Sequence, residues 1–335
     1  MSKQFKNLTE EDKEYLSFIY FQEMTHNEKI TILSNKFGVV GRTIRKWWVK
    51  LDLKELPSKL PLQLKEAQKR EIPIDTDIIL FTAAQNKTIP NISFLENLKS
   101  YKEYLQTTFN KKVEIVISGS RYRNPTSLIE SDKTKTDMWW EDSLVPFLYY
   151  GKYLFGDTLI STDTRIRPTA KEPLTGYEVL AKDNHLVLPH SKIHFKPLPR
   201  FKNHPLRVMT TTGFITRKNY SESKAGETAN EHHSYGFVIV EKKEDGTCHI
   251  PRNVKVKDDG SFIDIIYKVE NDKVSTIDKS SGFVWGDIHA DEIKQEVFDY
   301  TLNNLYPILK PKKTVLHDVL NGSSVNPHEK DDFFV

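Results

Sequence analysis

The sequence predicts a multidomain α/β protein with an N-terminal helix-turn-helix, a central α/β domain with a β-rich part, and the start of a further α/β layer at the C-terminus. Three observations support this. Apolar residues recur at helical spacing in the first 54 residues, strand-like runs flank an amphipathic stretch after residue 76, and the same alternation returns after residue 277. We therefore expect domains at 1–54, 76–276 and 277–335, with a linker at 55–75.

The composition limits the protein class. With 38% hydrophobic and 28% charged residues, the chain is neither disordered nor fibrous. Its net charge of +3 is too small to indicate a nucleic-acid partner by itself. Cys248 is the only cysteine, which excludes an internal disulfide and a zinc site built on several thiolates. Because no signal peptide or membrane-length apolar run is present, we expect a cytoplasmic protein without a membrane segment.

The first segment predicts three helices. Thr9 is a candidate N-cap followed by acidic residues, a second helix fits 28–37, and Gly38 is a plausible end for it. A third helix fits 41–51. Two helices joined by a short turn that contains glycine are typical of a helix-turn-helix.

The third helix is the predicted DNA contact. Ile44 and one of Trp47 and Trp48 can face the core, which leaves polar side chains for base edges and phosphates. Between residues 41 and 70, nine Lys or Arg stand against three acids, which favours DNA over a small protein-interaction domain. The candidate DNA-binding residues are Arg42, Thr43, Arg45, Lys46 and Lys50.

The central segment begins with a strand-helix-strand pattern. Apolar runs at 77–82 and 113–118 flank an amphipathic stretch at 94–108, which predicts a parallel strand pair. Further on, strand-like runs at 237–241 and 262–267 alternate with turns that contain glycine.

A polar stretch in this segment is a secondary candidate site. Its lysines suit phosphate and its histidines suit a metal, although adjacent histidines in a strand point to opposite faces. A surface loop without a binding role is the alternative. The residues are Lys218, Lys224, His232 and His233. Arg121 and Arg123, at a predicted strand end, are either phosphate contacts or solvated side chains.

The C-terminal segment contains the predicted metal site. Gly286-Asp-Ile-His289 and His317-Asp-Val-Leu-Asn321 each follow a strand-like run, and a predicted helix at 291–309 joins them. A strand-helix-strand crossover returns the second strand parallel to the first, so both loops open at the carboxyl edge of the sheet. Asp287, His289 and Asp318 are then expected to converge as ligands of divalent ions such as Mn²⁺.

These motifs resemble the first two motifs of the calcineurin-like metallophosphoesterases. In that resemblance Asp287 and His289 bind one ion and Asp318 bridges two, Mn²⁺ being the expected metal. The second motif departs from the family pattern, because His317 precedes Asp318 and Asn321 stands where a further acid is usual. The later metal-binding histidines have no room before Val335, although Asn326 and His328 are possible ligands. The resemblance therefore implies an incomplete domain at 277–335 and a fragment, a split-gene product or a truncated relative.

From Ile78 to the C-terminus the chain also resembles a tailed-phage family of pre-early nucleases and DNA-transfer proteins. The segments that carry this resemblance include 80–86, 119–125, 167–169, 173–176, 210–213, 219–220, 224–226, 232–233 and 286–289. It implies a phage metal-dependent DNA nuclease or phosphoesterase in the host cytoplasm, guided by the N-terminal domain. The alternative is a non-catalytic DNA-binding, DNA-transfer or regulatory protein with a vestigial metal site.

Overall fold

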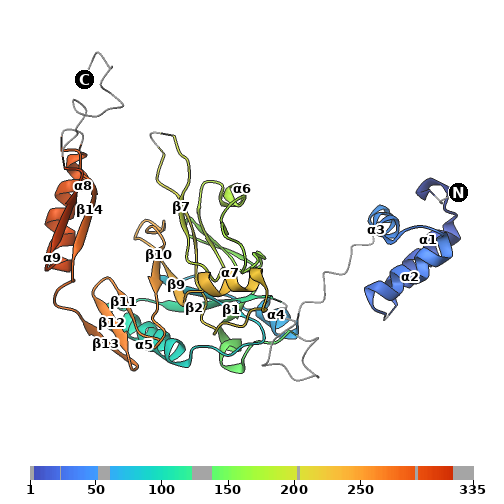
Figure 1. Cartoon of the computed structure of the whole chain (residues 1–335), viewed down its shortest axis with the longest axis horizontal. Coiled ribbons are helices and arrows are strands. Elements are labelled where there is room, and N and C mark those ends of the chain that lie inside the picture. Colours follow the sequence, from blue (N-terminus) through green and yellow to red (C-terminus); the bar gives the residue numbers. More distant parts are fainter. Residues whose placement is uncertain are drawn as a thin grey trace, which may run out of the picture. The chain divides into compact units, whose positions relative to one another are not determined.

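The computed structural model divides into two compact units, residues 1–61 and 62–335 (Figure 1). It describes residues 4–22, 24–51, 61–122, 138–201, 204–290 and 293–319. The chain is a mixed α/β protein, which confirms the predicted class, and its sheets contain both parallel and antiparallel pairs.

The first unit contains the three helices that the apolar spacing predicts. They are α1 Glu10–Phe21, α2 His26–Phe37 and α3 Gly41–Lys50, preceded by the short 3-10 turn η1 Phe5–Asn7. Thr9 and Thr25 each accept a hydrogen bond from the backbone three residues on, so both helices begin with a capping box. Because Thr25 is the cap, α2 begins two residues before the predicted start at Glu28.

Glycines shape the turn between α2 and α3. Gly38 caps α2 with a φ of +63°, a left-handed conformation that glycine adopts at little cost. A Cβ atom on Gly41 would lie 2.6 Å from the side chain of Ile30, so α3 starts in close contact with α2. Trp47 and Trp48 are both buried, whereas the sequence predicted only one of them in the core.

Both tryptophans find room because they pack against different helices. The Trp47 ring lies 5.5 Å from Phe37 of α2, and the Trp48 ring lies 5.2 Å from Tyr20 of α1, both edge-on. Trp48 also donates its indole N–H to the carbonyl of Leu16.

The second unit is organised around a five-stranded sheet in the order β10-β9-β1-β2-β3. The strands are β1 Ile78–Gln85, β2 Val113–Ser120, β3 Leu148–Tyr149, β9 Gly236–Glu241 and β10 Arg252–Lys255. β1 and β2 are parallel and joined by α5 Ile92–Phe109, which confirms the predicted strand-helix-strand unit. All residues of β1 are buried, as expected of a central strand covered on both faces.

A second five-stranded sheet has the order β4-β5-β6-β8-β7. Its strands are β4 Lys152–Phe155, β5 Thr158–Ser161, β6 His185–Leu188, β7 Phe195–Pro197 and β8 Val208–Thr211. β5, β6 and β8 are parallel to one another. Ile160 and Val187 of this sheet share one apolar core with Ile79, Phe81 and Val116 of the first.

Short helices and turns complete this part of the unit. They are α4 Leu62–Ala67, η2 Asp142–Phe147, α6 Glu178–Ala181 and α7 Lys224–His232. α4 lies within the segment predicted as a linker, and its Leu64 is fully buried. Gln63 exchanges two hydrogen bonds of 2.8 Å with the backbone of Trp140, which fixes α4 against the rest of the unit.

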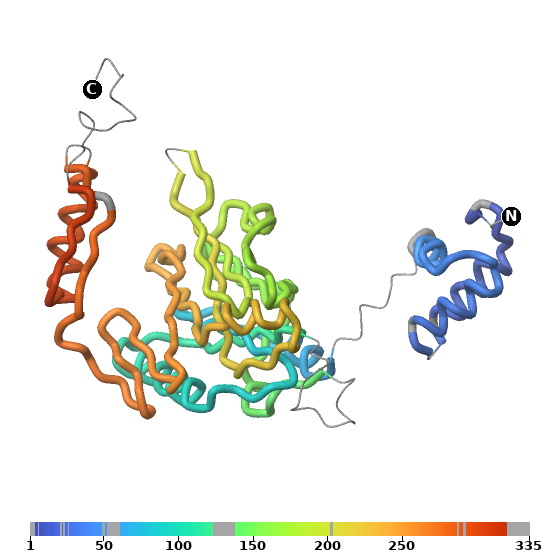
Figure 2. The backbone as a smooth tube through the Cα atoms, viewed as in Figure 1, coloured from blue at the N-terminus to red at the C-terminus, as the bar shows by residue number. Residues whose placement is uncertain are grey.

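Three antiparallel strands pack on α5 (Figure 2). They are β11 Phe262–Asp264, β12 Tyr267–Glu270 and β13 Lys273–Thr276. The sequence predicted one continuous run at 262–267, but Ile265 adopts a φ of +56° and the chain turns back there. Asp264 and Tyr267 thereby become cross-strand partners.

The C-terminal part repeats the strand-helix-strand pattern. β14 Phe283–Asp287 pairs in parallel with β15 Thr314–His317. The helical connection consists of α8 Gln295–Tyr300, a π-helical turn η3 Thr301–Leu305 and α9 Tyr306–Leu309. The parallel pairing and the helix between the strands confirm the predicted order of elements.

Candidate metal centre and nucleic-acid interface

The carboxyl ends of β14 and β15 bring the two predicted metal-binding loops together. The strands are in register at Asp287 and His317. Beyond that point the backbone pairing continues, because the His289 N–H donates to the carbonyl of Asp318 at 2.8 Å and the Ala290 N–H donates to that of Val319 at 2.9 Å. The crossover thus positions two of the three predicted ligands side by side.

His289 and Asp318 share an unusual backbone conformation. His289 has a φ of +41° and Asp318 a φ of +40°, although neither is glycine. A left-handed conformation costs a non-glycine residue of order 1 kcal/mol or more, and such residues gather at functional sites. Two of them lie here in hydrogen-bonded contact, one at the end of each strand.

The side chains fit a metal in part. His289 is half-buried, and its Nδ1 atom is buried without a hydrogen-bond partner. Asp318 is exposed, with a carboxylate oxygen 3.5 Å from Nδ1 of His317. A neutral imidazole and a carboxylate are ligands that suit Mn²⁺. His317, for which the sequence pattern predicted no role, contacts the Asp318 carboxylate directly.

The remaining predicted ligands lie outside the described residues. Asn326 and His328 belong to the undescribed segment 320–335, and the side chain of Asp287 is likewise not described. Among the side chains that are described, no group of three His, Cys, Asp or Glu is arranged to hold a metal ion. The pair His289 and Asp318 is therefore the described core of the candidate centre.

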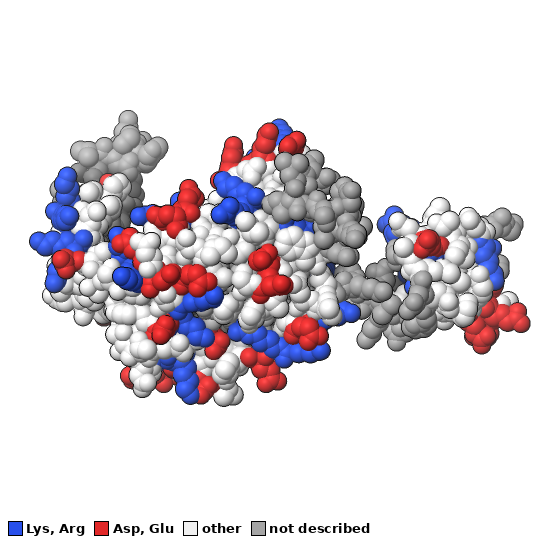
Figure 3. All heavy atoms as spheres, turned by 90° about the horizontal axis from the view of Figure 1, so that it is seen from below, with Lys and Arg blue, Asp and Glu red and all other residues white. Residues whose placement is uncertain are grey.

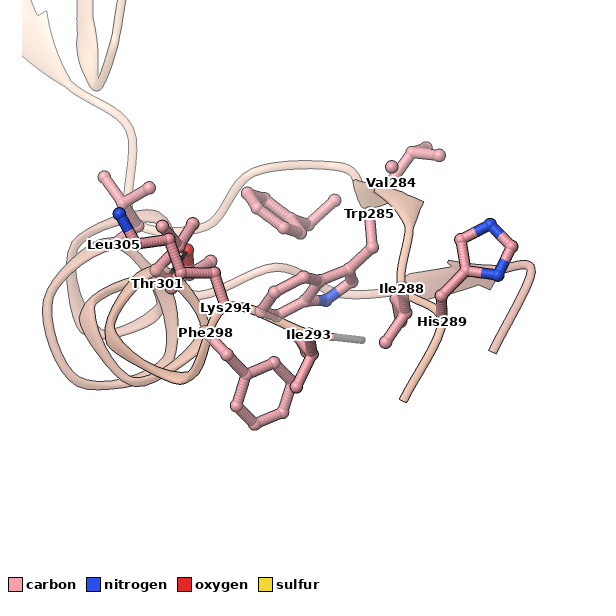
Figure 4. Close-up of a pocket in the computed structure, with 12 residues that line it drawn as sticks. Val284, Trp285, Ile288, His289, Ile293, Lys294, Phe298, Thr301 and Leu305 are labelled. Atoms are coloured by element: carbon pink, nitrogen blue, oxygen red, sulfur yellow. Dashed lines mark hydrogen bonds between the residues drawn. The ribbon is translucent and has the colours of Figure 1, made fainter. Parts of the chain in front are cut away.

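A hollow of about 470 Å³ next to these loops is largely apolar, and His289 is among the residues that line it. Trp285, Ile293 and Phe298 line it, and the His289 ring points away from this cluster (Figure 4). Val284 and Leu316, on the two strands, are 68% and 55% exposed. Parallel strands are normally covered on both faces. Here the apolar surface of the two strands is exposed, and no other described segment covers it.

The predicted DNA-contacting helix presents its basic residues to solvent. Arg42, Arg45 and Lys46 of α3 are exposed and follow one another at helical spacing, whereas Thr43 is half-buried. Ile44, Trp47 and Trp48 hold the opposite face in the core. The side chain of Lys50 is not described. This division into a basic face and a buried aromatic face is what a helix needs to enter a DNA groove.

On the face seen in Figure 3, Lys and Arg are mixed with Asp and Glu over most of the second unit, and Lys and Arg predominate at the left edge of the view.

Two of the four secondary candidate residues lie in a helix, whereas the sequence left a surface loop open as the alternative. Lys224 begins α7 and His232 ends it, with Ser223 as the N-cap. Lys218 is exposed, ahead of the helix. His233 is buried, and its Nδ1 lies 2.7 Å from the hydroxyl of Tyr220. The predicted strand alternation does not apply, because the two histidines stand at a helix end.

Burial lowers the pKa of His233 to about 4, and it does the same to His190. His190 accepts a hydrogen bond from the backbone N–H of Lys192 at Nδ1, and its Nε2 lies 3.0 Å from the carbonyl of Arg167. Sequence reasoning missed His190. Its only signal is its position just after the apolar run that forms β6. Burial favours the neutral form of both histidines, and the Nε2 atom of His233 is buried without a hydrogen-bond partner.

None of the described helices combines the length and the apolar character that a bilayer crossing needs.

Comparison with known proteins identifies a phage relative. The chain is 27% identical over 263 residues to Protein A1 of Escherichia phage T5, a match that covers 75% of this chain and 46% of the relative. The chain thus spans about half the length of the curated relative that it matches. The similarity confirms the phage part of the resemblance. No family model matches the chain, and no solved structure matches it.

Proposed function

We propose that the chain is part of a phage metal-dependent phosphodiesterase that acts on DNA. The observation that supports this best is the backbone pairing of His289 with Asp318, both in left-handed conformation, at the carboxyl ends of two parallel strands. Open α/β sheets place ligands at that edge. The similarity to a phage T5 protein agrees with the phage context and leaves the activity a proposal.

In this proposal Asp287, His289 and Asp318 hold divalent ions, with Mn²⁺ as the expected metal. Ions so held would polarise the phosphodiester and lower the pKa of a bound water. Asn326 and His328 are further possible ligands. The chain's own contribution is positional: the continued hydrogen bonding beyond β14 and β15 keeps the imidazole and the carboxylate on neighbouring backbones.

The exposed apolar surface of β14 and β15 bears on activity. In the proposed whole protein, further strands and helices of the same sandwich cover Val284 and Leu316 and complete the ligand set. We therefore expect full activity only when this surface is covered.

The proposed role of α3 is to deliver the metal centre to DNA. Arg42, Thr43, Arg45, Lys46 and Lys50 are the proposed contacts to phosphates and base edges. Such a helix gives affinity that depends on salt. The host cytoplasm is the proposed location, since DNA is the proposed substrate.

A non-catalytic DNA-transfer or regulatory protein is the second candidate. The observation that favours it is the absence, among the side chains described, of three metal-ligand groups in one place. This candidate binds DNA in the same salt-sensitive way and cleaves nothing with any metal.

Cleavage of plasmid DNA with Mn²⁺ distinguishes the two. An enzyme should give cleavage that Asp287→Asn abolishes while DNA affinity stays within about twofold, because the substitution keeps the shape and removes the charge that a cation needs. Assays should include the chain supplemented with a polypeptide that corresponds to the unmatched half of the phage relative. Equal cleavage by Asp287→Asn, or no cleavage in either assay, contradicts the enzyme proposal.

A further inference from the structure

The carboxyl ends of the parallel strands of both large sheets meet in the second unit. The Ser118 hydroxyl at the end of β2 donates to the carbonyl of Thr162, just after β5, at 2.9 Å. The Ile215 N–H, after β8, donates to the carbonyl of Ala83 in β1 at 2.8 Å. Two sheets thereby present their carboxyl ends to one region, and this is the edge at which α/β proteins bind ligands.

The last residue of β1 and the residue after it are polar and buried. Gln85 and Asn86 are each 1% exposed, although an interior favours apolar side chains. The Asn86 side-chain oxygen accepts from the backbone N–H of Tyr122 at 2.6 Å, but its Nδ2 has no hydrogen-bond partner. A buried amide without a partner costs about 1–3 kcal/mol, so this donor calls for a bound acceptor.

Arg121, the residue after β2, supplies a second hydrogen-bond donor, its guanidinium group. Its guanidinium is half-buried and contacts Tyr150, with Nη2 3.3 Å from the hydroxyl and the ring centre 5.8 Å away. No carboxylate of the described residues forms an ion pair with it. Burial, and next the charge of Arg165, lower the pKa of Arg121, so a second positive charge lies nearby. A partly desolvated guanidinium such as that of Arg121 is stabilised when an anion binds to it.

Hydrogen bonds hold the two residues on neighbouring segments of the chain. The Asn86 N–H donates to the carbonyl of Ser120 at 3.0 Å, and the Asn86 side chain holds the N–H of Tyr122. Arg121 is the residue between them. A Cβ atom on Gly119, near the end of β2, would lie 2.6 Å from the side chain of Leu64, so α4 packs closely against this end of the strand. Tyr150 then orients the guanidinium.

We propose that Arg121 and Asn86 form an anion site for the phosphate group of a nucleotide. A guanidinium fork and an amide N–H are the donors that phosphate oxygens accept, and Arg binds phosphate in a bidentate manner. The phosphate belongs either to a free nucleotide or to a phosphorylated DNA end. This site does not depend on the proposed metal centre, because it shares no residue with it and needs no metal.

The experiment measures binding to the full chain in EDTA, which silences any metal site. The probes are inorganic phosphate, a nucleoside 5′-monophosphate, and a short single-stranded oligonucleotide with or without a 5′-phosphate. Titration calorimetry compares the unaltered chain with Arg121→Gln and with Arg200→Gln, which removes an exposed arginine of the same unit. Arg121→Lys and Asn86→Asp extend the series in case Arg121→Gln fails to fold.

We expect the phosphorylated probes to bind, and Arg121→Gln to weaken them about tenfold or more while Arg200→Gln changes nothing. Arg121→Lys should retain part of the affinity, and Asn86→Asp should lose it by repulsion. Binding of the free nucleotide assigns the site to nucleotides, whereas binding of only the 5′-phosphorylated oligonucleotide assigns it to DNA ends. No phosphate-dependent binding by the unaltered chain, or equal losses in Arg121→Gln and Arg200→Gln, overturns the proposal.

Discussion

The backbone N–H of His289 donates to the carbonyl oxygen of Asp318 across 2.8 Å, and both residues have a positive φ. The two residues lie far apart in the sequence, and the parallel pairing of β14 with β15 brings them together. The contact turns two short motifs into one candidate site.

Reversing charge on α3 should weaken DNA binding. Arg45→Glu combined with Lys46→Glu is expected to lower affinity for duplex DNA about tenfold or more and to reduce the salt slope by about 0.9 for each phosphate that the helix no longer neutralises. Fluorescence anisotropy at several salt concentrations measures both. Lys255→Glu, an exposed lysine of β10, is the matched control. Unchanged affinity in the α3 double variant would remove this helix from the DNA interface.

Acid should destabilise the second unit through two buried histidines. His190 and His233 have pKa values of about 4 because burial disfavours their charged forms, against an ordinary value of 6.5. Between these values the unfolded chain binds protons that the folded chain does not, so the free energy of unfolding falls as the pH drops from 6.5 towards 4. The loss reaches up to about 3 kcal/mol for each histidine.

Thermal unfolding between about pH 7.5 and pH 4.5 tests this, a range that spans most of the interval between the unfolded and folded pKa values. His190→Gln and His233→Gln should each flatten the fall in the midpoint temperature relative to the unaltered chain. His249→Gln, at an exposed histidine, should leave the fall as it is. A slope in both buried variants as steep as that of the unaltered chain would show that other groups govern the acid response.

A buried ion pair locks β10 to the β11–β12 hairpin. Arg252 contacts Asp264 through two bonds of 2.9 Å, and the hydroxyl of Tyr101 in α5 donates to the same carboxylate at 2.6 Å. Arg252→Met leaves the Asp264 charge buried without its cation, so we expect a decrease of about 3–5 kcal/mol in the free energy of unfolding. Urea unfolding measures it. Lys268→Met breaks only the surface pair with Glu270 and should cost less than about 1 kcal/mol.

Local signals explain how much of the fold the sequence predicted. The cap at Thr9 and the glycine at 38, both predicted, mark helix ends by chemistry that acts within a few residues. The cap at Thr25 was not predicted, because the second helix was expected to begin at Glu28. The strand-helix-strand units were predictable because apolar runs of strand length flank amphipathic stretches. The turn at Ile265 was not predictable, because isoleucine rarely adopts the left-handed conformation and the contacts of the neighbouring Asp264 with Arg252 and Tyr101 come from distant parts of the sequence.

The candidate sites, like the fold, were predictable only where the signal lies within a short segment or in the order of the elements. The backbones of His289 and Asp318 are neighbours because β14 and β15 pair in parallel, and the order of strands and helix in the sequence predicts this pairing. The burial of both Trp47 and Trp48, the histidine His190 and the donor Asn86 depend on packing between segments far apart in the sequence. No spacing rule within one segment reports such contacts.

The most direct test of the proposed function is Mn²⁺ binding by the full chain, followed by electron paramagnetic resonance of the free ion. We expect the unaltered chain to remove the signal of free Mn²⁺, and His289→Ala and Asp318→Asn each to weaken that binding about tenfold or more, whereas His249→Ala has no effect. Equal Mn²⁺ affinity in all four proteins would contradict a metal centre at the ends of β14 and β15.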